Sequence, residues 1–259
     1  MRTLKLVVSY DGTHYHGFQK QKNYITVQNV LEEVLSKFCG EPVKLAGSGR
    51  TDAGVHALGQ TISLKTNGSI PCANLVRASR RMLPPDIVII SAEEVEADFH
   101  ARISAQWKRY LYRIIIDDYN SPFEVNYAWQ LQTPLNVASM NEAAQLLLGK
   151  HNFSAFRSSG SVDSSPWKTI YEAYWEVRGK ELYFHIAGDG FLYHMVRNLV
   201  WALVQIGLGK REGATLEEEL AGERCLFMNS PAPAQGLYLD AVYYSPYFPL
   251  KKDVKNLTK

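Results

Sequence analysis

The sequence has few cysteines, and they are not spaced for a metal site or a disulfide framework. Cys39, Cys72 and Cys225 are odd in number and far apart. Zinc sites and disulfide scaffolds use paired or closely spaced cysteines, so we expect free and mostly buried thiols. The seven histidines are scattered, without cysteine or carboxylate partners at ligand spacing. The sequence therefore predicts no metal site.

Long hydrophobic runs are also missing. No apolar stretch approaches the roughly 18 residues that a membrane-spanning helix needs. The chain passes from Met1-Arg2 directly into a strand-like stretch, without a signal-peptide pattern. With 46% hydrophobic residues in 259, it can nevertheless bury a large core. We expect a cytoplasmic protein with no membrane partner.

The chain has no large excess of charge of either sign. Its net charge of +2 does not by itself indicate a nucleic-acid partner. The distribution of charge is more informative. Arginines at i, i+3 and i+4 share one face of a helix predicted over Asn74–Met82, and a second basic group lies in the strand-like run that follows Trp107. Each group alone is typical of a solvated surface. Together they are compatible with phosphate contacts by Arg77, Arg80, Arg81 and Lys108.

Hydrophobic periodicity predicts an α+β order in the first half. A stripe of apolar residues follows Thr26, a good N-cap, and Gly40 is placed to end that helix. The expected strands are Leu4–Ser9, Val43–Ala46, Gln60–Lys65 and Ile87–Ser91, with helices from Val27 to Phe38 and over Asn74–Met82. This βαββαβ order is typical of a ferredoxin-like or RRM-like unit.

The second half repeats the pattern loosely. The expected strands are Trp107–Ile116, Ile170–Val177, Leu182–Ala187 and Leu237–Tyr244, with helices over Asn136–Leu148 and Leu192–Ile206. We predict two α+β halves, 1–104 and 105–245, whose mixed, mainly antiparallel sheets meet at a central cleft. A basic tail, 246–259, follows.

One stretch is rich in turn-forming and charged residues. From Gly47 to Ala57 the sequence reads GSGRTDAGVHA, between two strand-like runs. Glycine allows backbone conformations with positive φ, so Asp52 can be presented on a tight, exposed turn. A hairpin turn with a solvated Arg50 and Asp52 is the alternative explanation.

A carboxylate that acts on carbon or removes a proton needs an apolar wall and a nearby cation. Arg197 lies in an apolar helix where it needs an acidic partner, although it is also long enough to reach solvent. Tyr110 offers an aromatic face for a nucleobase, or is simply a core tyrosine. Arg50, next to the turn, is placed to enter a base stack and fill the gap left by a flipped nucleotide.

The run Gly49–Ala57 resembles the signature loop of the tRNA pseudouridine synthase A family without a gap. Other matching strings include Lys108–Tyr112 and the segment from Gly190 to Asn198. The resemblance implies that Asp52 is the catalytic carboxylate, that Arg50 assists base flipping, and that Tyr110 contacts the target uracil. It also implies that Arg197 pairs with Asp52. Trp201 departs from the small residue expected at that position.

The reaction implied is isomerisation of uridine to pseudouridine at tRNA positions 38, 39 and 40, just 3′ of the anticodon. The bond from ribose C1′ to uracil N1 breaks, and C1′ rejoins at C5. No cofactor is needed. Attack by Asp52 on C1′ or C6, or removal of a sugar proton, are both compatible with the sequence. The resemblance further implies a homodimer with one tRNA anticodon arm across both subunits.

Three other functions fit parts of the sequence. A phosphate-binding loop is disfavoured because the Gly-Lys-Ser/Thr ending of a P-loop and the third glycine of a dinucleotide fingerprint are missing. A non-catalytic tRNA-binding paralogue would explain the basic groups but not Asp52 with Arg197. A nucleosidase would cleave the same glycosidic bond and release free uracil.

Overall fold

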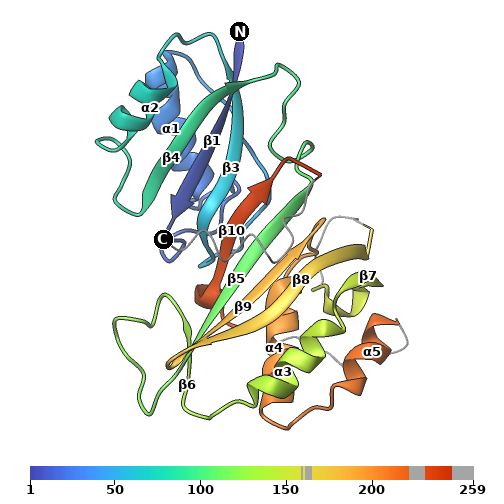
Figure 1. Cartoon of the computed structure of the whole chain (residues 1–259). Helices are drawn as coiled ribbons and strands as arrows, with labels where there is room; N and C mark the ends of the chain where they lie inside the picture. The colour runs from blue at the N-terminus through green and yellow to red at the C-terminus, as the bar shows by residue number, and fades with distance from the viewer. Residues whose placement is uncertain (159, 161–164, 222–230, 247–259) are drawn as a thin grey trace.

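The computed structural model describes residues 1–158, 160, 165–221 and 231–246, and these form one continuous mixed sheet with helices (Figure 1). The strands are β1 (Arg2–Tyr10), β2 (Ala46–Gly47), β3 (His56–Thr66), β4 (Ile87–Val95), β5 (Trp107–Ile116), β6 (Trp129–Leu131), β7 (Gly149–Asn152), β8 (Trp167–Arg178), β9 (Glu181–Gly188) and β10 (Leu237–Tyr243). Their order is β4-β1-β3-β10-β5-β9-β8-β7, with β2 beside β3 and β6 beside β5.

The helices cover the two ends of this sheet. They are α1 (Val27–Cys39), α2 (Cys72–Ser79), α3 (Val137–Gln145), α4 (Met195–Gly207) and α5 (Ala214–Leu220), with short 3-10 turns η1 (Ser154–Phe156) and η2 (Ala234–Gly236). Figure 1 shows α1 and α2 beside β4, β1 and β3, and α3, α4 and α5 beside β9, β8 and β7. Only the pairs β10–β3 and β5–β6 are parallel among the described strands. The predicted α+β class with a mainly antiparallel sheet is confirmed.

Helix α1 follows the predicted capping and periodicity. The Thr26 side chain accepts a hydrogen bond from the backbone N–H of Asn29, and Gly40 ends the helix with φ 69°. Val27, Leu31 and Leu35 are buried against the sheet, and burying such a side chain stabilises a fold by about 1.5–3 kcal/mol. Local sequence signals are therefore sufficient to define this helix.

Strand β10 joins the two predicted halves. Tyr238 and Leu239 pair in parallel with His56 and Ala57 of β3, while the other edge of β10 runs antiparallel to β5. The sequence predicts this strand but not its central position. Because β10 pairs with a strand from each half, the two sheets are one, and the start of β3 is held close to β5.

The faces of β5 alternate as predicted. Tyr110, Tyr112 and Ile114 are buried on one face. On the other face Arg109 pairs with Asp240, and Arg113 pairs with Glu124 and Glu181. Each arginine on that second face therefore has a carboxylate partner.

Several local predictions were wrong. Only Ala46 and Gly47 pair with β3, so the expected strand over Val43–Ala46 is not formed. Strand β3 begins at His56 rather than Gln60, which shortens the loop before it. Helix α2 ends at Ser79, and Met82 is 44% exposed beyond it.

Trp201, the cysteines and the helices can also be compared with the expectations from the sequence. Trp201 is half-buried and packs against the core. Cys39 and Cys72 are free thiols, whereas Cys225 lies outside the described residues, as does the basic tail after Pro246. In the described ranges, no helix is both long and apolar enough to cross a membrane.

Candidate active site

The loop between β2 and β3 places Asp52 at the start of a tight turn. The N–H of Val55 donates to the carbonyl of Asp52 at 3.1 Å, and Gly54 has φ 76°. A left-handed residue at this position of a turn favours glycine. A buried hydrogen bond also holds the turn to β1, because the hydroxyls of Tyr10 and Thr51 lie 2.7 Å apart.

The far end of the loop is anchored by His56, which is 2% exposed. Its Nδ1 accepts from the N–H of Gly12 at 3.0 Å, and its Nε2 is 2.9 Å from the carbonyl of Asn126 and 3.2 Å from that of Gln235. The Gly12 N–H and the two carbonyls fit a neutral ring with the proton on Nε2, while Oδ1 of Asp11 also lies 3.1 Å from Nδ1. Burial lowers the pKa of His56, against the opposing effect of the Asp11 carboxylate. The anchor connects the first half to two segments of the second.

Asp52 itself is held more loosely. Its Oδ2 lies 3.4 Å from an Nη of Arg197 and 3.4 Å from Nε2 of His194. The Asp52 side chain is 23% exposed, and the Arg197 side chain is 12% exposed. Within the described part of the chain, Oδ1 has no hydrogen-bond partner. The site therefore holds the carboxylate beside a cation and leaves its side chain partly exposed.

Arg197 is oriented by the backbone as well as by Asp52. Its Nε donates to the carbonyl of Ala232 at 2.6 Å, and its own carbonyl accepts from the N–H of Ala232 at 3.1 Å. Helix α4 and the segment before η2 thus fix the guanidinium. The contact between Asp52 and Arg197 that we expected is present, formed by residues 145 positions apart.

His194 is a site residue that the sequence analysis missed. It caps α4 with φ 60°, a left-handed conformation that is uncommon for histidine. Its Nδ1 lies 3.0 Å from Oγ of Ser158, which in turn is 3.5 Å from the amide nitrogen of Asn198. Burial lowers the pKa of His194, and Arg197 adds to that effect while Asp52 opposes it. The available signal was its spacing of three residues before Arg197, which places both near one face.

Tyr110 forms part of the apolar wall. It is 8% exposed, and Phe191 packs against it edge-to-face with ring centroids 5.0 Å apart. Burial, together with the nearby Tyr10 and Asp52, raises the pKa of the Tyr110 hydroxyl above its ordinary value. The hydroxyl is therefore protonated at neutral pH, and the side chain lies within electrostatic reach of Asp52.

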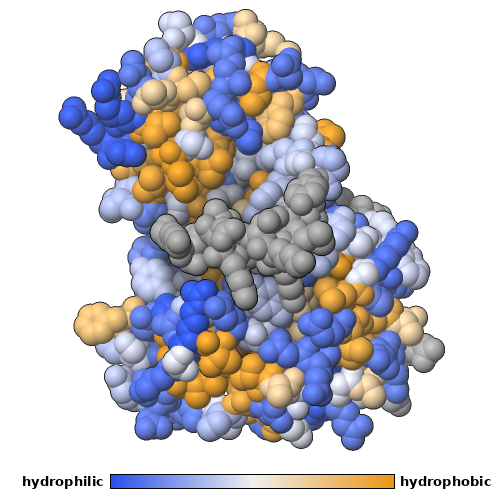
Figure 2. Space-filling model, in the orientation of Figure 1, coloured by the Kyte–Doolittle hydropathy of each residue, from blue (hydrophilic) through white to orange (hydrophobic). Residues whose placement is uncertain are grey.

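The predicted basic residues fall into two groups. Arg50 is exposed two residues before Asp52, and Lys108 is half-buried on the same face of β5 as Tyr110. Arg77, Arg80 and Arg81 are exposed at the end of α2, where Figure 2 shows hydrophilic side chains projecting at the upper left. Helix α2 packs on β4, the outer strand, so the structure does not bring these three arginines to Asp52.

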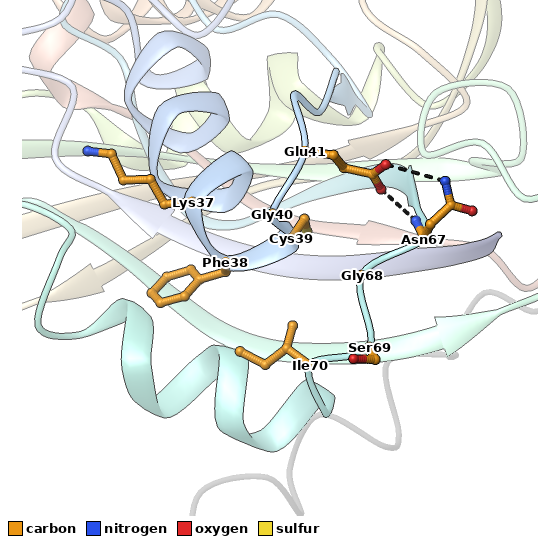
Figure 3. A pocket seen from close by; sticks show the side chains of 9 residues that line it. All are labelled: Lys37, Phe38, Cys39, Gly40, Glu41, Asn67, Gly68, Ser69 and Ile70. Atoms are coloured by element: carbon orange, nitrogen blue, oxygen red, sulfur yellow. Dashed lines mark hydrogen bonds between the residues drawn. The ribbon is translucent and has the colours of Figure 1, made fainter.

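A separate depression lies at the other end of the N-terminal half. It has a volume of about 560 Å³ and is lined by the end of α1, Glu41 and residues 67–70 (Figure 3). Strand β3 runs from His56 to Thr66, about 33 Å at strand rise, so this depression is remote from Asp52. Glu41 is hydrogen bonded there to Thr66 and Asn67. In the described residues, no group of three or more His, Cys, Asp or Glu side chains is placed to hold a metal ion.

The sequence and fold of this chain were compared with those of known proteins. The family model described as tRNA pseudouridine synthase matches residues 6–103 and 143–245. Proteins called tRNA pseudouridine synthase A from Acetivibrio thermocellus and Thermoanaerobacter sp. (strain X514) are 45% and 44% identical over 244 residues, covering 94% of this chain and all of theirs. A crystal structure of a Cbf5-Nop10-Gar1 complex is 12% identical with a TM-score of 0.33, covering 78% of this chain and 44% of that chain.

The α+β fold brings a carboxylate and an arginine from distant parts of the chain together at one site. The chain belongs to the tRNA pseudouridine synthase family. It is therefore an isomerase that acts in tRNA pseudouridylation.

Proposed function

We propose that the protein converts uridine to pseudouridine at positions 38, 39 and 40 of the tRNA anticodon arm, with Asp52 as the catalytic carboxylate. The observation that carries this proposal is the placement of Asp52 beside Arg197 and near the buried Tyr110. A carboxylate can attack carbon or remove a proton, and the Arg197 guanidinium lies beside the carboxylate of Asp52.

The reaction is balanced without an oxidant or a second substrate. The C1′–N1 bond breaks, the C1′–C5 bond forms, C5 loses its proton and N1 gains one. Asp52 serves either by attack on C1′ or C6, or by removal of a sugar proton. Tyr110 supports the uracil with its ring, and Arg50 occupies the space that the flipped nucleotide leaves.

The remaining parts of the proposal rest on the resemblance of the sequence to the family. The partner is the anticodon arm of tRNA, held between the halves 1–104 and 105–245 of a cytoplasmic homodimer. Exposed arginines at the end of α2 contact the RNA backbone outside the catalytic site, and a lysine of β5 contacts it beside Tyr110. These contacts would come from Arg77, Arg80, Arg81 and Lys108.

A modification assay tests the function directly. The purified protein is incubated with an unmodified tRNA transcript, without metal or nucleotide, and pseudouridine is mapped by carbodiimide-dependent reverse-transcription stops. We expect stops at positions 38, 39 and 40, and none with Asp52→Asn. Transcripts with cytidine at each position in turn assign the stops.

Other outcomes identify the competing functions. Release of free uracil would indicate a nucleosidase. Equal tRNA binding by both proteins, with no pseudouridine from either, would indicate a non-catalytic tRNA-binding protein. Stops elsewhere in the tRNA would retain the isomerase and overturn the assigned positions.

A further inference from the structure

Lys108 lies close to the proposed site, but the chemistry described above does not use it. It precedes Tyr110 by two residues in β5, so both side chains are on one face of the strand, about 7 Å apart. Its ammonium approaches Gly49, where a Cβ atom would lie 3.2 Å from Nζ. Lys108 therefore reaches from the floor of the site to the loop that carries Asp52.

Two further cations act on Lys108. Lys168, at the start of β8, has its Nζ 3.6 Å from the position of a Cβ on Gly190, in the segment that leads to Phe191. Arg102 lies in the segment between β4 and β5. The charges of Arg102 and Lys168 are both felt at Lys108. We call Arg102, Lys108 and Lys168 the phosphate cradle. Its three residues come from three separate segments of the chain.

Across the described ranges, no carboxylate forms an ion pair with any member of the phosphate cradle. Burial, with the added repulsion of Arg102 and Lys168, lowers the pKa of Lys108 to about 8. The opposite face of β5 is different, because Arg109 and Arg113 are each paired with carboxylates. One face of β5 thus has its cations neutralised by carboxylates, whereas Lys108 on the other face is subject to the repulsion of two further cations.

We propose that the phosphate cradle binds the phosphodiester next to the target uridine. This inference rests on the proposed function and assigns a substrate contact within it. Lys108 and Tyr110 share one face of β5 two residues apart, so a nucleotide whose base contacts Tyr110 has its backbone on the side of Lys108. A phosphate supplies the missing negative charge, and two lysines and an arginine are typical phosphate ligands.

The cradle has a specific use in isomerisation. After the C1′–N1 bond breaks, the uracil must turn while the ribose stays in place. The ribose is then attached to the RNA only through its backbone. A phosphate fixed beside Tyr110 keeps C1′ facing the uracil, so that C5 can rejoin it.

The test removes one charge from each side of the contact. Anticodon-arm hairpins are synthesised with a neutral methylphosphonate at one linkage at a time. Binding is measured in the Asp52→Asn background, with Lys108→Met, Lys168→Met and Lys108→Arg added separately. Lys210→Met is the matched control, because Lys210 is exposed in the turn after α4, at the end of the molecule away from β10 (Figure 1).

We expect the neutral linkage beside the target uridine to weaken binding about tenfold, and Lys108→Met to weaken binding of the unmodified hairpin by a similar factor. Combining the two changes should cause no further loss, whereas Lys108→Met and a neutral linkage elsewhere should have multiplicative effects. Lys108→Arg should retain binding, and Lys210→Met should behave as the parent. Addition of inorganic phosphate tests whether a free anion competes for the same cations.

The cradle would be overturned if, for both Lys108→Met and Lys168→Met, the loss of binding affinity multiplied with the loss caused by a neutral linkage at every position of the hairpin. Phosphate competition that is unchanged by either variant would also overturn it. Pseudouridine formation by the Asp52-containing protein is scored separately. If the lysine substitution and the neutral linkage have non-additive effects but no pseudouridine is formed, the cradle is retained and the proposed function is rejected. If pseudouridine is formed but the two effects are independent, the proposed function is retained and the cradle is rejected.

Discussion

The two ends of the signature loop differ in how firmly they are held. His56 is almost completely buried and has polar neighbours at 2.9–3.2 Å. Asp52, four residues earlier, is partly exposed, and both of its side-chain contacts are at 3.4 Å. A carboxylate saturated with short hydrogen bonds would be a poor nucleophile or base. One end of the loop is therefore fixed in position, whereas the proposed catalytic carboxylate at the other end is left partly exposed.

The largest expected effect is at the loosely held end. Asp52→Asn replaces the carboxylate with an isosteric amide that can neither attack carbon nor remove a proton. We expect a fall of at least about 10⁴-fold in the single-turnover rate, about 5.5 kcal/mol. The free energy of unfolding should change by less than about 1 kcal/mol. A large loss of stability with retained activity would reverse the comparison.

The next effect concerns the cation beside Asp52. Arg197→Met removes the positive charge and the hydrogen bond to the Ala232 carbonyl, so we expect a rate loss of about 10²–10³-fold. Arg197→Lys keeps the charge but loses the contact with the Ala232 carbonyl, so its rate should lie between those of the parent protein and Arg197→Met. Single-turnover rates at saturating tRNA separate this effect from binding. A change confined to tRNA affinity would assign Arg197 to RNA binding alone.

The firmly held end is tested by stability. His56→Ala leaves the Gly12 N–H and two backbone carbonyls without their partner, and should lower the free energy of unfolding by about 2–4 kcal/mol. His14→Ala, at an exposed histidine, is the control. Denaturant titration measures both. Equal stability of the two variants would show that the anchor contributes nothing.

The same histidine predicts a pH dependence of stability. Burial lowers the pKa of His56 below 6.5, so the unfolded chain takes up a proton first as the pH falls. Stability contributed by His56 is therefore present above pH 6.5 and is lost below it, by at most about 1.4 kcal/mol per pH unit. The difference between the parent and His56→Asn isolates this slope from those of other histidines. Parallel curves would contradict the prediction.

The smallest effect is at His194. Asparagine tolerates the left-handed backbone at this position but is too short to reach Asp52. His194→Asn should slow the reaction about tenfold, the equivalent of one hydrogen bond. In the parent, protonation of His194 below pH 6.5 adds a charge beside Arg197, so activity should fall there. The rate profile of the variant should lack that acidic decrease, and an unchanged profile would remove His194 from the site.

Features with a local signal could be predicted from the sequence. Thr26 and Gly40 define α1 to within a residue, and alternation defines both faces of β5. For α1 and β5 the physical requirement is contained in neighbouring residues. The contact between Asp52 and Arg197 joins residues 145 positions apart, and it was expected because the resemblance to the family implies it, in addition to the need of an arginine in an apolar helix for an acidic partner.

Features that depend on distant partners could not be predicted. The insertion of β10 between β3 and β5 follows from pairing across some 180 residues, which no local pattern encodes. Short elements such as β6, β7 and α5 carry too few residues to show periodicity. The backbone conformation of His194 depends on how α4 meets the Ser158 segment, so its approach to Asp52 was missed.

The central position of β10 has a consequence for biosynthesis. A growing chain contains the Asp52 loop and the Arg197 helix well before residues 237–243 leave the ribosome. Until then the edges of β3 and β5 that β10 will join are open, and the Ala232 carbonyl that orients Arg197 has only just been added. A chain interrupted before β10 thus contains Asp52 and Arg197 but lacks the strand that joins β3 to β5. The central part of the sheet is therefore completed only at the end of translation.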